Sequence, residues 1–317
     1  MSGPSAFEST RFAVIIVNYG SSALLESGAA RLALPPNGTV VLVDCFSDVD
    51  ERARVAALAE RHGWTSVLLD RNAGFGGGSN AGAQTALRTG AQVLVFLNPD
   101  AQIDRASLAA LVSTAATDPC TLVSPRIVTG DGGAWFAGAD LYLDDGTTAG
   151  AARRARNGHR PRREWATGAC FAVSAPLWER VGGFDEEYFL YWEDIDFSHR
   201  VLDAGGRLLL LEEARAVHDE GGTHGDAVAG RAKSETYYYH NIRNRLLYAA
   251  KHLDDEDLAA WLRSAPRVAY RVLLQGGRRQ LLTSIAPWRA YARGLRDGRR
   301  VARRPRATPA GTDPTRR

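Results

Sequence analysis

Asp100 and His218 stand where a protein could bind a divalent cation. Each follows an apolar run, and Asp100 comes directly after Asn98-Pro99. Carboxylate oxygens suit Mg²⁺ or Mn²⁺, and imidazole can ligate Mn²⁺. Two alternatives stay open: Asp100 is a turn residue after Pro99, and nearby His224 replaces His218 as the ligand. The two residues predict a metal site.

A carboxylate base is predicted in the segment 182–197, GGFDEEYFLYWEDIDF, which interleaves acidic and aromatic residues. Aromatic surroundings disfavour an ionised carboxyl group and raise its pKa toward the range useful for general-base chemistry. Glu193 and Asp194 stand at the start of a predicted helix, after Trp192. The alternative is that both acids only favour the helix dipole in a first turn.

Two further segments are suited to gripping a nucleotide. Asp44 ends a predicted strand, and its carboxylate could accept the imide N–H of a uracil or thymine ring. The Gly-rich segment 72–80, NAGFGGGSN, enters a helix, and such a loop can approach a phosphate or ribose closely. A dinucleotide fingerprint is the competing interpretation, but Gly74-x-Gly76 followed by Ser79 matches it poorly and does not follow the first strand.

The elements that must position these residues alternate between strand and helix, which predicts an α/β architecture with a mostly parallel sheet. In such sheets ligands bind beyond the carboxyl ends of the strands. The predicted strands are Phe12–Val17, Thr39–Asp44, Thr65–Leu69, Gln92–Leu97 and, later in the chain, Arg207–Leu211. The predicted helices are Ser21–Leu32, Val49–His62, Gly78–Thr89 and Arg231–His252.

The composition fits a folded globular protein, with 45% hydrophobic and 24% charged residues in a chain of 317. We predict a flexible N-terminus over residues 1–10 and a nucleotide-sugar-binding type of domain over 11–228, with a ligand-binding half (11–128) and a catalytic half (129–228). A helical C-terminal region over 229–304 and a disordered tail over 305–317 follow.

The cysteines and the apolar runs bear on location. Cys45, Cys120 and Cys170 have neither the spacing of a zinc site nor the density of a disulfide scaffold, which favours the reducing cytoplasm. The longest apolar runs, Val93–Leu97 and Leu208–Leu211, are too short to cross a bilayer, and no signal peptide is expected. Any membrane association should therefore be peripheral, on the inner face of the cell membrane.

The positive charge is concentrated at the C-terminal end. Residues 263–317 carry 15 Arg and 2 Asp, a local charge of +13, which leaves −10 for residues 1–262 given the total of +3. Within Ala286–Arg304, apolar residues recur at helical spacing against a rim of Arg, which is typical of a helix on an anionic membrane surface. These apolar residues are Trp288, Tyr291, Ala292 and Leu295. The alternative is a helix packed on the protein. Nucleic-acid binding by the Arg-rich end is a weaker hypothesis, because the body is acidic and lacks a recognisable module.

Taken in this order, the motifs resemble glycosyltransferase family 2, the inverting enzymes of GT-A fold, and within it the bacterial rhamnosyltransferase-like group. The resemblance spans residues 12–250. Its motifs are Val17-Asn18-Tyr19, Asn72-x-Gly74-Phe75-Gly76, Asn80-x-Gly82, Asn98-Pro99-Asp100, Trp165-x-Thr167-Gly168-Ala169-Cys170, Gly182-Gly183-Phe184-Asp185, Trp192-Glu193-Asp194-x-Asp196, and His218 before Gly221-Gly222.

The resemblance implies a role for each of these positions. Asp194 is the implied catalytic base, with Glu193 beside it, and Asp100 and His218 are the implied ligands of Mg²⁺ or Mn²⁺. The implied donor-binding residues are Val17, Asn18, Tyr19, Asp44, Asn72, Gly74, Phe75, Asn80, Asn98 and Asp100. The implied acceptor-binding residues are Trp165, Thr167, Gly168 and Trp192. Cys45 departs from the family, in which many members have Asn, because a thiol lacks the donor and acceptor pair of an amide.

The implied reaction is a single displacement in which a sugar passes from a nucleoside diphosphate to an acceptor hydroxyl. The resemblance favours dTDP-L-rhamnose as donor, with UDP- and other dTDP-sugars open. The acceptor is expected to be a glycan, a lipid-linked sugar or a small molecule. A non-catalytic nucleotide-sugar binder is the alternative that the sequence leaves open.

Overall fold

The computed structural model describes residues 6–218 and 232–304, which form two compact units. Unit 1 contains the described residues up to Tyr142 and from Thr148 to 218, and unit 2 contains Leu143–Thr147 and the residues from 232. The predicted boundary at 228, the expected disordered tail and His224 lie outside the described residues. At the N-terminal end, where a flexible segment was expected, Ala6–Ser9 form a short helix, α1, whose Phe7 is buried.

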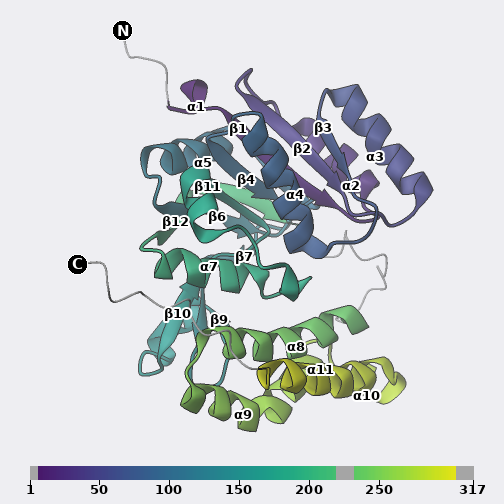
Figure 1. The fold of residues 1–317 in the computed structure, drawn as a ribbon, viewed down its shortest axis with the longest axis vertical. Helices are drawn as coiled ribbons and strands as arrows, with labels where there is room; N and C mark the ends of the chain where they lie inside the picture. Colours follow the sequence, from purple (N-terminus) through teal and green to yellow (C-terminus); the bar gives the residue numbers. More distant parts are fainter. Residues whose placement is uncertain (1–5, 219–231, 305–317) are drawn as a thin grey trace, which may run out of the picture. The chain divides into compact units, whose positions relative to one another are not determined.

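Unit 1 is built on a mixed, mostly parallel sheet (Figure 1). Its strands lie in the order β3-β2-β1-β4-β11-β6-β12-β5, with β7 paired to β6. Their bounds are β1 Phe12–Asn18, β2 Gly38–Asp44, β3 Thr65–Leu68, β4 Val93–Leu97, β5 Ala101–Ile103, β6 Thr121–Val128, β7 Ala134–Phe136, β11 Cys170–Ser174 and β12 Arg207–His218. Strands β1 to β4 are parallel, as predicted, whereas β11 inserts antiparallel between β4 and β6.

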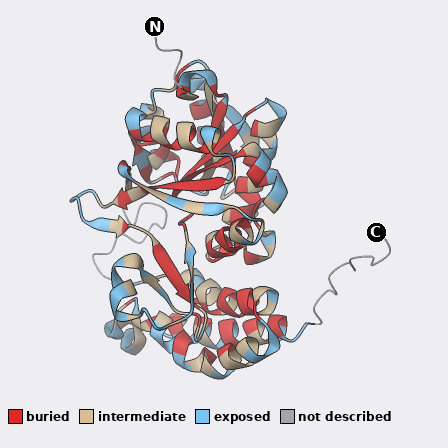
Figure 2. Cartoon of the chain, turned by 90° about the vertical axis from the view of Figure 1, so that its left-hand side faces the viewer, coloured by how far each residue is buried: buried red, intermediate tan, exposed pale blue. Residues whose placement is uncertain are grey.

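Helices cover both faces of this sheet because side chains of a strand alternate between its faces. Phe12, Val14 and Ile16 of β1 pack in the core on one face, and Ala13 and Ile15 pack in the core on the other. The first core includes residues of α1, α2 (Ser22–Ser27), α3 (Val49–His62) and α5 (Arg105–Thr117). The second includes residues of α4 (Gly74–Arg88), α6 (Ala175–Val181) and α7 (Glu193–Asp203). Figure 2 shows the central strands as the most continuously buried part of unit 1.

Two predicted helices have different bounds for identifiable reasons. The helix expected over Ser21–Leu32 ends at Ser27, and a 3-10 turn over Ala29–Arg31 follows Gly28. The helix expected from Gly78 begins at Gly74, so the Gly-rich segment is largely helical rather than a loop. Its glycines allow close packing, since a Cβ on Gly78 would lie 2.7 Å from Val17 Cγ1 and one on Gly82 would lie 2.6 Å from Ile15 Cγ2.

A small antiparallel sheet completes unit 1. Its strands are β8 (Ala139–Tyr142), β9 (Thr148–Gly150) and β10 (Arg162–Trp165), in the order β10-β8-β9. Asp140 on β8 is fully buried, and its carboxylate lies 2.9 Å from Arg154 Nε and 3.7 Å from Arg162 Nε. This carboxylate fixes the Arg-rich connection between β9 and β10.

Unit 2 is helical, with α8 (Glu235–His252), α9 (Asp255–Leu274), α10 (Arg278–Thr283) and α11 (Ala286–Ala302). The predicted helix from Arg231 begins at Glu235, because Ser234 caps it by accepting a hydrogen bond from Tyr237 N. On α11, Gly294 and Gly298 allow a close approach to α8, where a Cβ on either would lie 3.0 Å from α8 side-chain atoms.

The apolar stripe of α11 is mostly used for packing within unit 2. Leu295 is buried in the core formed with α8 and α9, and Tyr291 packs against that core. Trp288 is 41% exposed. The expectation that this stripe faces a membrane is therefore wrong for Tyr291 and Leu295. None of the helices within residues 6–218 and 232–304 has the length and apolar character needed to cross a bilayer.

Candidate active site

Strand pairing brings Asp100 and His218 together, although they are far apart in the sequence. Strand β12 runs antiparallel to β5 with His218 opposite Ala101, so Asp100 lies beside the imidazole. Asp100 Oδ1 is 3.2 Å from His218 Nε2, and the two side chains are only 4% and 8% exposed. The Trp135 ring lies 4.4 Å from the imidazole, centroid to centroid.

The Asp100–His218 pair has the donor set that a divalent cation needs. Within the described part of the chain, the buried His218 Nδ1 has no hydrogen-bond partner, and the buried Asp100 Oδ1 makes no hydrogen bond although it lies 3.2 Å from His218 Nε2. Buried polar atoms without partners are costly in a folded protein unless another group satisfies them. One carboxylate and one imidazole fit Mn²⁺ or Mg²⁺, whose remaining ligands a diphosphate could supply.

Asp194 lies in the first turn of α7, where backbone N–H groups hold its carboxylate. Its Oδ2 accepts a hydrogen bond from Gly168 N at 3.1 Å, and its Oδ1 accepts one from Ile195 N at 2.8 Å. Burial raises the pKa of Asp194 to about 6, against these hydrogen bonds, which lower it. The side chain remains partly exposed. A carboxylate with this pKa is ionised near neutral pH yet basic enough to take a proton.

Backbone contacts place Asp194 and Asp100 at the same edge of the sheet. Gly168 binds Asp194, and the carbonyl of the next residue, Ala169, accepts a hydrogen bond from Asn98 N at 2.9 Å. Asn98 starts the turn that follows β4 and ends at Asp100. The carboxylate on α7 and the carboxylate after β4 are therefore linked through two successive residues, Gly168 and Ala169.

The segment before Asp194 is conformationally strained. Phe189, Tyr191 and Trp192 have φ values of 63°, 63° and 78°, in the left-handed region that non-glycine residues rarely adopt. Phe75 N donates a hydrogen bond to Phe189 O, and a Cβ on Gly74 would lie 2.1 Å from that oxygen. Such strain persists only where the surroundings impose it, and it is concentrated at functional sites.

Glu193 differs from Asp194 in its surroundings. It is buried, and burial together with the negative charge of Asp194 raises its pKa well above the usual value. The two neighbouring acids therefore differ in how readily they ionise: the surroundings favour the neutral form of Glu193 more strongly than that of Asp194.

The side chains of Asn72 and Asn80, in the glycine segment, form hydrogen bonds with backbone groups of the protein. Asn72 Oδ1 accepts a hydrogen bond from Gly74 N at 2.8 Å. The amide of Asn80 both donates to Phe184 O and accepts from Phe184 N, each at 2.9 Å. These bonds tie α4 to the segment that leads into Asp194. Phe75 lies edge-on to Phe184 at 5.6 Å between ring centroids.

At the end of β2, Asp44 is fully buried and already has a cationic partner. Its Oδ2 accepts a hydrogen bond from Arg52 Nε at 3.1 Å, while Oδ1 has no partner among residues 6–218 and 232–304. Arg52 also donates to the Leu69 carbonyl, and its guanidinium lies 4.5 Å from the Phe46 ring centroid. Asp44 can therefore offer a nucleotide base one oxygen, Oδ1.

Asn18 is turned into the protein. It is fully buried, donates to Glu51 Oε1 at 3.1 Å and accepts from Ser21 N at 3.1 Å. Although burial opposes the effect, hydrogen bonds from Asn18 and Ser22 hold the pKa of Glu51 below its usual value. Asn18 thus fixes the loop after β1, whereas neighbouring Tyr19 is 52% exposed.

Cys45 packs in the core under the glycine helix. Its sulfur packs against Gly78 of α4, and a Cβ added to that glycine would lie only 2.8 Å from the sulfur. Burial raises the pKa of the thiol to about 11. The thiol is accordingly inert. A larger amide at this position would meet α4, so the departure from the family pattern accompanies close packing of the glycine helix.

The expected acceptor residues lie around Gly168. Thr167 is buried, and its hydroxyl accepts a hydrogen bond from Ala169 N at 3.3 Å. Trp165 ends β10 with its ring 5.7 Å from that of Phe136, and its Nε1 has no partner among the described residues. Trp192 is buried directly before α7.

Relatives identified by sequence are glycosyltransferases. The chain is 24% identical over 251 residues, 74% of each protein, to the hexosyltransferase Agl10 of low-salt glycan biosynthesis from Haloferax volcanii. It is 29% identical over 142 residues to the N-acetylglucosaminyl-diphospho-decaprenol L-rhamnosyltransferase of Mycobacterium tuberculosis, which covers 39% of this chain and 46% of that protein. A 55-residue segment is 40% identical to rhamnosyltransferase WbbL of Escherichia coli K12, 17% of this chain and 21% of that protein. No protein-family model matches the chain.

Solved structures with the same fold are glycosyltransferases too. Mannosyltransferase PcManGT from Pyrobaculum calidifontis, in complex with GDP-Man and Mn²⁺, aligns with a TM-score of 0.53 at 19% identity over 94% of this chain and 87% of that chain. GalNAc-T7 with UDP, GalNAc and Mn²⁺ aligns with a TM-score of 0.57 at 16% identity over 92% of this chain and 56% of that chain. The chain therefore has the GT-A fold of these glycosyltransferases, which confirms the predicted fold class. The names of the relatives support the glycosyltransferase activity that the motifs implied.

Three residues of this candidate site were not predicted from the sequence. Arg52 pairs with Asp44, Glu51 accepts a hydrogen bond from the Asn18 amide, and Trp135 lies beside His218. Arg52 and Glu51 fall in the first turns of α3, where charged residues usually face solvent, so their types and spacing do not distinguish them from surface residues. Trp135 and Phe136 follow a Gly-containing turn, and this aromatic pair is the one feature of the sequence that could have indicated a residue of the site there.

Proposed function

We propose that this glycosyltransferase is a family 2 enzyme that transfers a hexose with inversion from a nucleoside-diphosphate donor to an acceptor hydroxyl. The observation that carries the proposal is the environment of Asp194. Asp194 is only partly buried as a residue, and two N–H groups hold its carboxylate, whose pKa burial raises to about 6, at the sheet edge where Asp100 lies. Those are the properties required of a general base at neutral pH.

The proposed reaction is a single displacement. The acceptor hydroxyl transfers its proton to Asp194 as its oxygen forms a bond to the anomeric carbon. The bond between that carbon and the diphosphate oxygen breaks on the opposite face, and the leaving diphosphate takes the electron pair. Gly168 N–H orients Asp194 by binding Oδ2. Glu193, favoured in its neutral form, adds little negative charge beside the base.

Asp100 and His218 are the residues that would hold the divalent cation, Mn²⁺ or Mg²⁺. Their buried, unpartnered atoms support this assignment, and PcManGT and GalNAc-T7 were both solved with Mn²⁺. When bound, the cation supplies positive charge opposite the departing diphosphate. Trp135 limits the mobility of the imidazole by lying against it.

For the donor we propose a dTDP- or UDP-sugar, with dTDP-L-rhamnose favoured. Two relatives are rhamnosyltransferases, and Asp44 Oδ1 is available to accept the imide N–H of thymine or uracil. Tyr19, Phe75 and the Asn98 turn would contact the donor. Asn18, Asn72 and Asn80 act by positioning, because their amides bind the protein.

For the acceptor we propose a sugar presented at Trp165, Thr167, Gly168 and Trp192. The support is that Gly168 N donates a hydrogen bond to the proposed base, Asp194. A lipid-linked sugar in the cytoplasm, at the inner face of the membrane, is the favoured acceptor. The support is that one relative is named for an N-acetylglucosaminyl-diphospho-decaprenol acceptor.

The test is a calorimetric screen of dTDP-, UDP- and GDP-sugars with and without Mn²⁺, followed by turnover of the donor that binds. Asp194→Asn should retain donor affinity and lose turnover by about 100- to 10,000-fold. Asp203→Asn, a 54% exposed carboxylate on the same helix, is the matched control and should keep its activity. Donor binding without turnover by the unmodified chain would instead indicate a non-catalytic nucleotide-sugar binder.

A further inference from the structure

Unit 2 exposes a cluster of large apolar side chains where α9, α10 and α11 meet. Leu282 and Ile285 are 87% and 76% exposed, more than any other large hydrophobic residue in the described part of the chain. Tyr270 and Trp288 are 44% and 41% exposed. We call these four residues the apolar corner. Single exposed apolar residues are ordinary, but a contiguous group marks an interaction surface.

Contacts of Trp288 order its side of the apolar corner, and Leu282 and Ile285 stand close to it along the chain. The rings of Tyr270 and Trp288 stack with centroids 6.2 Å apart. Trp288 Nε1 donates a hydrogen bond to Leu281 O at 3.0 Å, which fixes the indole beside the residue preceding Leu282. Ile285 is the residue directly before α11. The indole is therefore held at the surface by its polar edge while its apolar ring stays exposed.

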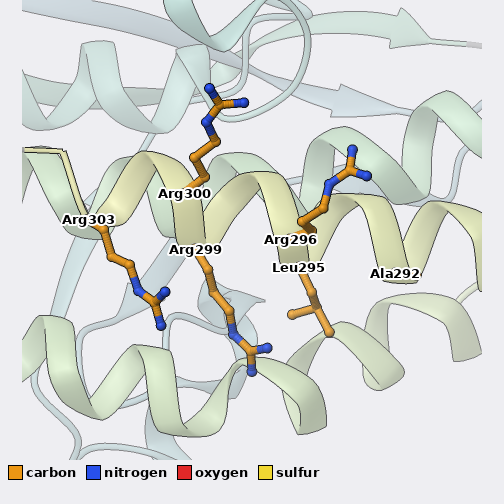
Figure 3. Close-up of a pocket in the computed structure, with 6 residues that line it drawn as sticks. All are labelled: Ala292, Leu295, Arg296, Arg299, Arg300 and Arg303. Carbon is orange, nitrogen blue, oxygen red and sulfur yellow. The ribbon is translucent and has the colours of Figure 1, made fainter.

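Arginines lie beside the apolar corner on α9 and α10. Arg278 and Arg279 on α10 are exposed, and Arg263 and Arg267 lie on the same stripe of α9 as Tyr270. Further along α11, roughly 16 to 22 Å from Trp288 at 1.5 Å per residue, Arg299, Arg300 and Arg303 line a hollow with Arg296. Figure 3 shows Arg299 and Arg303 extending to one side of α11 and Arg296 and Arg300 extending to the other.

Most of these arginines carry uncompensated charge. Arg289 and Arg293 pair with Glu235, and Arg296 pairs with Asp297. Arg271, next to Tyr270, pairs with Asp145. By contrast, no ion pair with a described residue is formed by the arginines beside the corner, Arg263, Arg267, Arg278 and Arg279, or by Arg299, Arg300 and Arg303 further along α11. The acidic residues of α9 occupy its first turn, roughly 22 Å from Tyr270 at 1.5 Å per residue. The corner therefore presents apolar side chains within a positive field.

We propose that this surface of unit 2 binds the headgroup region of an anionic bilayer, with Leu282, Ile285, Trp288 and Tyr270 entering the interface and the arginines contacting lipid phosphates. Exposed apolar residues beside an indole and a tyrosine, with a rim of Arg, suit the membrane interface, where one side of the site is apolar and the other is wet and charged. The inserting residues are those of the corner, not the packed stripe of α11. The proposal goes beyond sugar transfer and does not depend on it.

The test is sedimentation of the full chain with vesicles of phosphatidylcholine alone or mixed with phosphatidylglycerol. The unmodified chain should bind only the mixed vesicles, and high salt should weaken binding. Leu282→Ser with Ile285→Ser should lower the partition coefficient at least about tenfold, because each side chain loses its transfer into an apolar phase. Arg278→Ala with Arg279→Ala should lower it about fivefold per arginine. Val49→Ser, at a 70% exposed site on unit 1, is the matched control and should bind unchanged.

Donor affinity, measured on the same variants, separates this proposal from the sugar-transfer assignment, because none of the substituted residues lies in the candidate active site. Equal sedimentation with neutral and anionic vesicles, or unchanged binding by the Leu282 and Ile285 double variant, overturns the proposal. A dimer in solution that the double variant dissolves, without vesicle binding, would identify the corner as a self-association surface and also overturn it. The proposal is also overturned if the protein does not bind vesicles but binds nucleic acid in a salt-sensitive manner, and if the Leu282 and Ile285 double variant keeps that binding.

Discussion

Replacing Asp194 with Asn should make the protein inactive but more stable at neutral pH. Burial raises the pKa of Asp194 from 3.8 to about 6. At about 1.4 kcal/mol per pKa unit, keeping this group ionised in the folded state costs about 3 kcal/mol above pH 6. The amide removes that cost. It also loses one acceptor, since the two carboxylate oxygens receive hydrogen bonds from different N–H groups, a loss of about 1 kcal/mol.

The net gain in the free energy of unfolding is therefore about 2 kcal/mol at pH 7.5. The folded state binds the Asp194 proton more tightly than the unfolded state, so the native carboxyl stabilises the fold at low pH and loses that contribution as pH rises from about 4 to 6. The advantage of Asp194→Asn should shrink over that window and disappear near pH 4.

Urea unfolding followed by circular dichroism at pH 7.5, 6, 5 and 4 measures this gain. Asp203→Asn on the same helix should change stability by less than about 1 kcal/mol at every pH, because Asp203 is 54% exposed and its pair with Arg163 lies at the surface. An amide oxygen at this position can still accept a hydrogen bond from the buried His199 Nε2. A destabilised Asp194→Asn at pH 7.5, or a gain that does not depend on pH, would refute the assignment of a buried, raised-pKa carboxylate. Retained turnover would refute its role as the base.

Three further substitutions test the rest of the site. Asp100→Ala should abolish the effect of Mn²⁺ on donor affinity in calorimetry, and equal affinity with and without metal in the unmodified protein would contradict the cation assignment. Arg52→Ala should cost about 2 kcal/mol of unfolding free energy in urea titration, because the buried Asp44 carboxylate loses its charged donor; no change would mean that solvent satisfies Asp44. Gly78→Ala should cost about 1–3 kcal/mol by overpacking, whereas Gly158→Ala, whose Cβ would meet no atom closer than 3.6 Å, should be neutral in thermal unfolding.

Alternating apolar runs and turn residues predicted the strands and helices of the first hundred residues closely. Strands β1 to β4 end within a residue of their predicted ends, and α3 has the predicted bounds because Asp48 caps it and Gly63, in a left-handed conformation, ends it. Local chemistry determines such features. The prediction of a loop for the glycine segment was wrong, because no local feature of the sequence distinguishes a loop that approaches a phosphate from a helix whose glycines pack against β1 and β2.

By itself the sequence determined the order of the motifs, the carboxylates and imidazole available for chemistry, and the concentration of Arg beyond residue 262. These depend only on residue types and their spacing. Only the tertiary structure decided that His218 lies beside Asp100, because that contact depends on the antiparallel register of β12 against β5, across more than a hundred residues. It likewise decided that Asn18 is buried, that Arg52 occupies one oxygen of Asp44, and which apolar residues of the C-terminal helices remain exposed. Burial and pairing between distant segments set those properties, and neither is encoded in local spacing.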